Sequence, residues 1–318
     1  MKKNIILIGA GKRLQNDVIP ALEVSDAFNV VGIYARSTRT ILISNLSQQV
    51  RSLNELDFEK IKKADWIYIG VPSSSLRSVF KFLAGFPLKN ISLLVDTPVI
   101  PWRYSRVKKY FKNFYQVVVA EDIVYLPWIE PLKKALGGKI TEMIFEHSAY
   151  AYHGIALAKT LADCRNFKKA RLDKLNGETA MKLEFSNGAA VSIFEPRDYA
   201  KGAMIFSGPS GKIDDCFPYS GASMFPIVCE GKCLGINIAG EKVIFSEQET
   251  KLIGPVLKNA TITSMTLQLK RIGLLKIFKG LAEEEKNGRN VSDAVSDTRL
   301  NEFVHWFGWF VNVARFLP

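Results

Sequence analysis

Cysteine and histidine are scarce in this chain of 318 residues, which has four Cys and three His. The cysteines lack the dense, regular spacing of a disulfide scaffold; they are Cys164, Cys216, Cys229 and Cys233. The last two have no second pair of metal ligands near them, so we expect no metal site. No apolar run approaches the ~20 residues of a membrane-spanning helix. We therefore expect no stable membrane insertion.

A basic start, Lys2-Lys3, precedes a short apolar run over residues 5–8. The pattern resembles a signal peptide, but the run is too short for one. Lys12-Arg13 also stand where a cleavage site would need small residues. We interpret the run as a first β-strand and expect a cytoplasmic protein.

Acidic residues are fewer than basic ones, 31 against 43, which gives a net charge of +12. Phosphate binding uses Lys and Arg, but no helix-turn-helix, zinc-finger or RNA-binding motif accompanies them. We therefore expect no nucleic-acid partner. The positive electrostatic field of the protein would also attract an anionic cofactor or an anionic small-molecule substrate. An ordinary basic surface is an equally good explanation of the net charge.

Short apolar runs alternate with amphipathic stretches in the first 120 residues. Strands are predicted over 4–8, 30–34, 66–70, 92–95 and 117–120, and helices near 17–24, 39–50, 74–83 and 103–113. This alternation predicts an α/β domain with a doubly wound parallel sheet of the Rossmann type. The strands are nearly continuous apolar runs, as a sheet covered on both faces requires.

The regular alternation of predicted strands and helices ends at about residue 140. Predicted strands then follow one another over 141–151, 181–185, 189–194, 204–206 and 212–213, with helices over 153–163, 264–285 and 291–316. Ser186-Asn187-Gly188 is a hairpin signal. We expect an NADP-binding Rossmann domain at 1–121. We expect an α+β domain for substrate binding and oligomerisation at 122–318, with an open, mostly antiparallel sheet. The last helices pack on either domain.

A Gly9-x-Gly11 motif directly follows the first predicted strand. The first glycine permits a tight turn, and the second lets the backbone approach a pyrophosphate at a helix N-terminus. Leu14 replaces the third glycine of the full motif. The context still predicts a dinucleotide site, with Lys12 and Arg13 beside the turn.

The second predicted strand has no acidic residue at its end, where an NAD site holds the ribose 2′-hydroxyl. It ends instead in Ala35, Arg36, Ser37 and Arg39. Arginine there accommodates a 2′-phosphate. The sequence therefore favours NADP(H) over NAD, with an ordinary basic loop as the alternative.

The turn after the third predicted strand, Val71-Pro72-Ser73, also lies at a carboxyl end of the sheet. Ligands bind beyond these ends. We expect this turn to contact the ribose or the nicotinamide.

Several segments together resemble the glucose–fructose oxidoreductase / inositol dehydrogenase / MocA (Gfo/Idh/MocA) family over nearly the whole chain. They are the turn at 8–11 and the segments 64–72, 94–98, 119–127, 185–189 and 273–293. The resemblance implies a Rossmann domain followed by an open-sheet domain. It also implies a nicotinamide cofactor and hydride transfer on sugars, polyols or related small molecules. Family members form homodimers or homotetramers through the sheet of the second domain, which we expect here.

Two polar motifs of this family are altered. Its Glu-Lys-Pro appears as Asp96-Thr97-Pro98, which by the resemblance lines the nicotinamide edge. Thr97 lacks the cation of the lysine that contacts the cofactor and the reacting oxygen. The family's Asp-x-x-x-His appears with Ala149 in place of the aspartate and with His153 retained. His153 is then a candidate proton donor, or makes a structural hydrogen bond at a helix start.

Tyr150 and Tyr152 supply two further hydroxyls, on one face of the strand predicted over 141–151. Either is a candidate acid, or packs against core or ligand. Dehydrogenation needs a base, whereas reduction needs a hydride and a proton. The sequence therefore favours an NADP(H)-dependent oxidoreductase reducing a carbonyl or imine of a small polar or anionic metabolite, with Thr97 and His153 in its site. A biliverdin-reductase-like or cyclic-imine reductase, and a non-catalytic NADP-binding sensor or scaffold, are the alternatives.

Overall fold

The computed structural model describes residues 2–43, 46–97, 105–149, 151–175, 178–219, 221–283 and 288–307. The chain divides into two compact units. Unit 1 comprises Met1–Asp122 and Leu274–Thr298, and unit 2 comprises Ile123–Gly273 and Arg299–Pro318. The chain passes between the units within α8 (Thr266–Ala282) and within α9 (Val291–Phe307).

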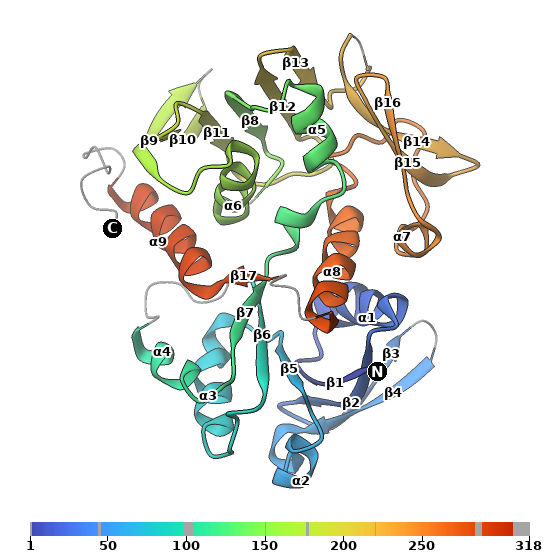
Figure 1. The fold of residues 1–318 in the computed structure, drawn as a ribbon, viewed down its shortest axis with the longest axis vertical. Helices are drawn as coiled ribbons and strands as arrows, with labels where there is room; N and C mark the ends of the chain where they lie inside the picture. Colours follow the sequence, from blue (N-terminus) through green and yellow to red (C-terminus); the bar gives the residue numbers. More distant parts are fainter. Residues whose placement is uncertain are drawn as a thin grey trace. The chain divides into compact units, whose positions relative to one another are not determined.

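Unit 1 is built on a mainly parallel sheet with the strand order β17-β7-β6-β5-β1-β2-β4-β3 (Figure 1). Its strands are β1 (Lys3–Ile8), β2 (Phe28–Ala35), β3 (Arg39–Ile43), β4 (Leu46–Ser52), β5 (Trp66–Ile69), β6 (Ser92–Asp96), β7 (Val117–Ala120) and β17 (Arg289–Asn290). Its helices and helical turns are η1 (Leu14–Val18), α1 (Ile19–Ser25), η2 (Leu53–Glu55), α2 (Phe58–Ile61), α3 (Ser73–Leu83) and α4 (Ser105–Phe111), and η3 (Asp122–Tyr125) begins at its boundary with unit 2. This confirms the predicted Rossmann-type sheet.

The direction of chain winding reverses between β1 and β5. After β1 the chain adds β2, then β3 at the outer edge and β4 between β2 and β3, and it then returns to place β5, β6 and β7 on the other side of β1. The central strands are apolar and buried, with Ile5–Ile8 and Trp66–Ile69 at most 3% exposed. Such a reversal opens a crevice beyond the carboxyl ends of the strands, where doubly wound folds bind ligands.

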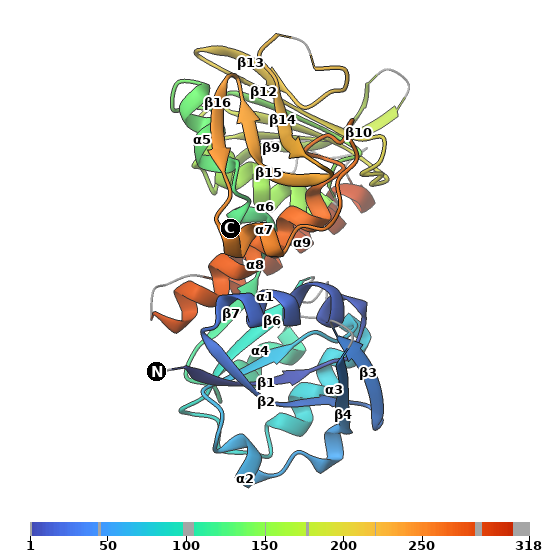
Figure 2. The same ribbon diagram turned by 90° about the vertical axis from the view of Figure 1, so that its right-hand side faces the viewer.

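The helix predicted over 39–50 is wrong. β3 and β4 form an antiparallel pair in which Arg39 lies opposite Val50, and Figure 2 shows this pair at the edge of the sheet. Ile41 and Ile43 are buried, whereas Leu42 is 66% exposed. This two-residue period and the β-branched content of the segment favour a strand over a helix.

Unit 2 contains a sheet with the order β13-β12-β8-β11-β10-β9 and a smaller sheet with the order β14-β15-β16. The strands are β8 (Glu142–Glu146), β9 (Phe167–Leu175), β10 (Glu178–Phe185), β11 (Ala190–Phe194), β12 (Ala203–Gly208), β13 (Gly211–Asp214), β14 (Met224–Cys229), β15 (Lys232–Ile238) and β16 (Glu241–Ile244). The helices that belong to it alone are α5 (Ile129–Ala135), α6 (Ala151–Ala162) and α7 (Glu247–Lys251). All pairings within these sheets are antiparallel except that of β8 with β11. This confirms the predicted mostly antiparallel sheet.

Two local predictions for unit 2 have different outcomes. The hairpin at Ser186-Asn187-Gly188 is confirmed, because β10 and β11 pair around it and Gly188 has a positive φ of 86°. The strand predicted over 141–151 is too long, since β8 ends at Glu146 and α6 begins at Ala151. His147, with φ of 49°, breaks the extended backbone between them. In the described part of the chain, no helix is long and apolar enough to cross a membrane.

Asp215 is a fully buried carboxylate in unit 2. One of its oxygens accepts a hydrogen bond from the Met204 amide at 2.5 Å. The other accepts from the Thr263 amide at 2.7 Å and the Thr263 hydroxyl at 2.6 Å. Burial raises the pKa of Asp215 to about 6, although these hydrogen bonds oppose the rise.

We expect Asp215 to make the stability of unit 2 depend on pH. Because the folded state raises this pKa above the unfolded value of about 4, the stabilising contribution of the protonated group is complete below pH 4. It is lost as the pH rises through 6, lowering the free energy of unfolding by about 3 kcal/mol. Denaturant unfolding from pH 4.5 to 7.5, compared with Asp215→Asn, measures this difference. Parallel pH profiles for the two proteins would contradict it.

Candidate functional site

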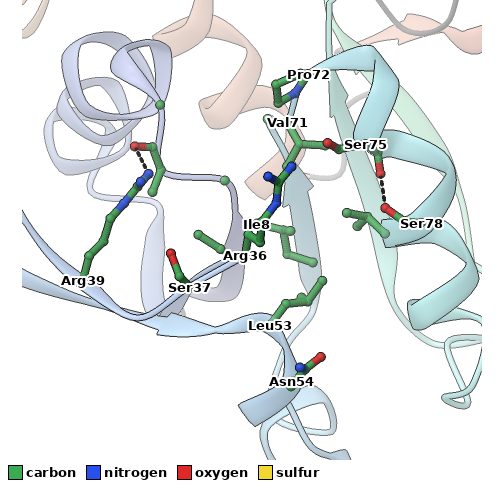
Figure 3. Close-up of a pocket in the computed structure, with 16 residues that line it drawn as sticks. Ile8, Arg36, Ser37, Arg39, Leu53, Asn54, Val71, Pro72, Ser75 and Ser78 are labelled. Atoms are coloured by element: carbon green, nitrogen blue, oxygen red, sulfur yellow. Dashed lines mark hydrogen bonds between the residues drawn. The ribbon is translucent and has the colours of Figure 1, made fainter.

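A pocket of about 620 Å³ lies where the chain winding reverses, at the carboxyl ends of β1, β2 and β5 (Figure 3). It belongs entirely to unit 1. The residues that line it are Ile8, Gly9, Ala10, Gly11, Ala35, Arg36, Ser37, Arg39, Leu53, Asn54, Gly70, Val71, Pro72, Ser75, Ser78 and Val79. The pocket therefore brings together eight of the residues that the sequence predicts to bind the cofactor: Gly9, Gly11, Ala35, Arg36, Ser37, Arg39, Val71 and Pro72.

Gly9 brings two strand ends into close contact. Its φ is +134°, and a Cβ atom added to it would lie 2.3 Å from the carbonyl oxygen of Gly70. The Gly9 amide donates to Tyr34 O, and the Gly70 amide donates to Ile8 O, each at 2.8 Å. Only glycine satisfies both the backbone angle and the contact. The floor of the pocket thus depends on the absence of a side chain at this position.

The turn after Gly9 is fixed by side chains that bind one carbonyl. Arg39 Nη2 and Gln15 Nε2 both donate to Ala10 O at 2.9 Å. In a planar trans peptide the next amide points opposite to this carbonyl, so these two bonds also set the direction of the Gly11 N–H. Apart from its chain neighbours, a Cβ atom on Gly11 would meet no atom of the described residues within 4 Å. Gly11 is therefore not required by the packing of the protein itself.

Arg36 is the cation that points into the pocket, whereas Arg39 turns toward the Ala10 carbonyl (Figure 3). Within the described residues, Arg36 makes no hydrogen bond and no ion pair. Ser37 lines the same wall, and no carboxylate is among the lining residues. This wall suits an anion better than a ribose hydroxyl, which needs an acceptor.

Glu55 directly follows the lining residues Leu53 and Asn54 in the sequence. Its carboxylate makes hydrogen bonds to groups that do not line the pocket. Its Oε1 accepts from the Thr38 hydroxyl at 2.9 Å and from the Ser52 amide at 2.8 Å. The Ser52 amide also donates to Thr38 Oγ1 at 3.1 Å. Hydrogen bonds from Ser52 and Thr38 lower the pKa of Glu55. These hydrogen bonds fasten the loop over residues 36–39 to the end of β4. They also keep the Glu55 carboxylate out of the pocket lining.

The structure does not place all predicted cofactor residues in the pocket. Lys12, Arg13, Ser73, Asp96 and Thr97 are not among its lining residues, and Pro98 lies outside the described residues. Arg13 instead forms ion pairs with Asp17 at 3.3 Å, with Asp96 at 3.5 Å and with Asp122. Leu14, in place of the third glycine, is buried at the start of the π-helical turn η1. A side chain fills the space that the full motif leaves open.

The catalytic candidates of unit 2 lie near the start of α6. His153 is buried, and its ring centre lies 4.3 Å from that of Tyr152. Tyr152 lies within α6 and not on the predicted strand. The expectation that Tyr150 and Tyr152 share one face of a strand therefore does not apply. Tyr150 itself lies outside the described residues. Ala149 is buried and leaves no acid at the position of the family aspartate.

Several residues of the pocket are not among those predicted from the sequence. Gln15 fixes the turn, and Leu53, Asn54, Ser75, Ser78 and Val79 line the walls. Ser75, Ser78 and Val79 follow from the helix predicted over 74–83, whose first turns must face the crevice. No sequence signal identifies Leu53 and Asn54, because their position depends on the β3–β4 pair. Among the residues that the structure describes, no cluster of three or more His, Cys, Asp or Glu side chains is able to hold a metal ion.

No protein-family model matches this sequence, and no curated protein matches it. Solved structures do resemble the fold. An oxidoreductase from Agrobacterium radiobacter, in complex with NAD⁺, L-tartaric acid and magnesium, has a TM-score of 0.64 at 14% identity, and the match covers 100% of both chains. A myo-inositol dehydrogenase from Corynebacterium glutamicum has a TM-score of 0.60 at 11% identity, covering 97% of each chain.

A scyllo-inositol dehydrogenase from Lactobacillus casei, with bound NAD(H) and scyllo-inositol, has a TM-score of 0.59 at 11% identity. This match covers 99% of the present chain and 100% of the dehydrogenase. The likeness spans both units of the chain, and such low identity establishes architecture and not activity. The chain has the two-domain fold of the Gfo/Idh/MocA oxidoreductases.

Proposed function

We propose that this protein is an NADP(H)-dependent oxidoreductase that reduces a carbonyl or imine group of a small polar or anionic metabolite. The observation that carries the proposal is the pocket at the reversal of unit 1. It combines two glycines after β1 with an arginine after β2 that has no hydrogen-bond or ion-pair partner among the described residues. This is the arrangement by which doubly wound folds hold the pyrophosphate and the adenosine ribose of a dinucleotide.

The charge of the pocket wall supports NADP(H) over NAD. A ribose 2′-phosphate needs donors and positive charge, which Arg36 and Ser37 offer, with Arg39 close to the glycine turn. A 2′-hydroxyl needs an acceptor, and the lining residues contain no carboxylate. Two of the similar solved structures contain NAD⁺ or NAD(H). We propose that the 36–39 loop accounts for a different preference in this chain.

The nicotinamide half of the cofactor would extend from the pocket toward the end of β6, where Asp96 and Thr97 lie. Thr97 donates or accepts a hydrogen bond but carries no charge. We therefore propose the reductive direction, in which the protein must supply a hydride from the cofactor and one proton, and needs no strong base. His153 is the proposed proton donor, because imidazole titrates near neutral pH, and Tyr152 is the second candidate.

Oxidation of NADPH tests this function. We expect purified protein to oxidise NADPH with at least one member of a panel of aldehydes, keto acids, keto sugars and cyclic imines. We expect His153→Ala to lower turnover by roughly 10²- to 10⁴-fold, as for loss of a general acid, while NADPH binding stays unchanged. Tyr152→Phe, which keeps the neighbouring ring and removes one hydroxyl, tests the second candidate proton donor in the same assay.

Two results would overturn parts of this proposal. Unchanged turnover in His153→Ala would remove His153 from its role. Tight NADPH binding without turnover on any member of the panel would favour the alternative of a cofactor-binding sensor or scaffold. That alternative is motivated by the neutral Thr97 and the buried Ala149 at positions where the family carries charge.

A further inference from the structure

The carboxyl end of β6 lies one strand beyond the pocket, next to β5, whose end lines it. β6 lies beside β5, with Val95 opposite Ile69, and it ends at Asp96. A dinucleotide that places its 2′-phosphate at the end of β2 extends across β1 and β5, so its nicotinamide approaches the end of β6. This placement rests on the proposed function.

Among the described residues, three carboxylates surround one arginine at this end of the sheet. Arg13, from the segment after the glycine turn, contacts three carboxylates. Its Nε lies 3.5 Å from Asp96 Oδ2, its Nη1 lies 3.3 Å from Asp17 Oδ2, and its Nη2 contacts Asp122. The side chain of Asp96 is only 11% exposed and that of Asp122 only 1%. One guanidinium therefore faces three carboxyl groups in a largely buried site.

Asp96 is only partly satisfied by these contacts. In the described part of the chain, neither Asp96 Oδ1 nor the buried Tyr68 hydroxyl makes a hydrogen bond of ordinary distance and angle. Burial raises the pKa of Asp96; Arg13 and the neighbouring Tyr68 side chain oppose this rise, and Asp122 adds to it. Among the described residues, the charged and titratable side chains that act on Asp96 are Arg13, Asp122 and Tyr68, and Arg13 also pairs with Asp17.

From this geometry we infer that the carboxylate cluster around Arg13 senses the redox state of the cofactor and binds NADP⁺ in preference to NADPH. The oxidised nicotinamide ring carries a positive charge, and the reduced ring is neutral. A buried carboxylate attracts the cation strongly because the surroundings screen little of its charge. The cluster thereby makes bound NADPH a stronger hydride donor. A tenfold preference corresponds to about 30 mV for a two-electron couple.

The preference depends on pH in a defined direction. Asp96 gains its charge as the pH rises through its elevated pKa, so the ratio Kd(NADPH)/Kd(NADP⁺) increases with pH. Titration of the 2′-phosphate affects both nucleotides alike and cancels in the ratio. The attraction is mutual, so binding of NADP⁺ also releases more protons than binding of NADPH.

The test is calorimetric titration of the whole protein with NADP⁺ and NADPH between pH 5.5 and 8.5. We expect Asp96→Asn to lower the ratio Kd(NADPH)/Kd(NADP⁺) at pH 8 by about fivefold or more and to flatten its pH dependence. Asp26→Asn is the matched control. It removes an exposed carboxylate that precedes β2, at the amino ends of the parallel strands, and we expect it to keep the wild-type ratio. 2′-Phospho-ADP-ribose, which lacks the nicotinamide, binds the wild type and Asp96→Asn equally.

The outcomes separate this inference from the proposed function. If 2′-phospho-ADP-ribose and both cofactors fail to bind the wild type, the proposed function falls and the inference falls with it. If all three bind but the ratio is the same in Asp96→Asn, only the inference is overturned. If Asp96→Asn does not fold, the wild type decides alone, because a ratio Kd(NADPH)/Kd(NADP⁺) of one or less at pH 8 overturns the inference.

Discussion

Gly9→Ala is expected to destabilise unit 1 by several kcal/mol and to abolish nucleotide binding. The new methyl group would lie 2.3 Å from Gly70 O, and the φ of +134° is one that alanine rarely adopts. Backbone strain of this kind costs about 1–3 kcal/mol, and overpacking adds about 1–3 kcal/mol. Relief requires β1 and β5 to separate at the point where the pocket lies. Denaturant unfolding measures the stability, and titration with NADPH measures the binding.

Gly11→Ala is the matched control for this prediction. Apart from its chain neighbours, its methyl group would meet no atom of the described part of the chain within 4 Å, and Gly11 does not have a positive φ. We expect the free energy of unfolding to stay within about 0.5 kcal/mol of the wild type, as for ordinary surface substitutions. Nucleotide binding is nevertheless expected to weaken, because the methyl group occupies the path of the pyrophosphate. Equal stability of Gly9→Ala and the wild type would contradict the described turn.

Arg36→Ala is expected to weaken NADPH binding by roughly 10- to 150-fold and to leave NADH binding unchanged. Loss of a charge-assisted hydrogen bond costs about 1.5–3 kcal/mol, which converts to this factor at 1.4 kcal/mol per tenfold. We expect the substitution to leave the stability of the fold unchanged, because Arg36 is exposed and has no ion pair among the described residues. Titrations of both proteins with both nucleotides at one fixed salt concentration measure the effect.

Arg39→Ala separates the two arginines of the wall. Arg39 binds the Ala10 carbonyl, so its loss loosens the glycine turn and is expected to weaken NADPH and NADH alike. Arg36 has no such contact and acts on the 2′-phosphate alone. An equal loss of both nucleotides in Arg36→Ala would show that this residue shapes the loop and does not select the cofactor.

The parallel sheet was accessible from the sequence because its strands are buried on both faces. Nearly continuous apolar runs such as Ile5–Ile8 and Trp66–Ile69 predict strands that are buried on both faces of a sheet. The glycine turn was accessible for a related reason, since its motif lies directly between strand and helix. The hairpin at residues 186–188 followed from its turn residues alone.

The β3–β4 pair departs from the usual pattern of a Rossmann unit. Such units place a helix after the second strand, which agrees with the helix that the sequence predicts over 39–50. The burial of this segment alternates with a period of two, with Ile41 and Ile43 inward, and tertiary pairing with β4 determines its structure. Leu53 and Asn54 entered the pocket through this pair, so no local pattern marked them.

The role of Arg13 also lay beyond the sequence. A basic residue beside a glycine turn is typical of a phosphate contact. Its actual partners, Asp96 and Asp122, lie more than 80 residues away in the chain and approach only when β6 and β7 align beside β5. Long-range ion pairs of this kind leave no periodic signal. The three carboxylates that surround Arg13 among the described residues come together only in the folded chain.

The central claim is that the pocket of unit 1 binds NADP(H) through its 2′-phosphate. Titration of the wild-type protein with NADPH and with NADH, followed by the fluorescence of its five Trp residues, tests it most directly. We predict that NADPH binds at least about tenfold more tightly, a difference of about 1.4 kcal/mol, and that the advantage declines with added salt. Equal affinities, tighter NADH binding, or no binding of either nucleotide would contradict the claim.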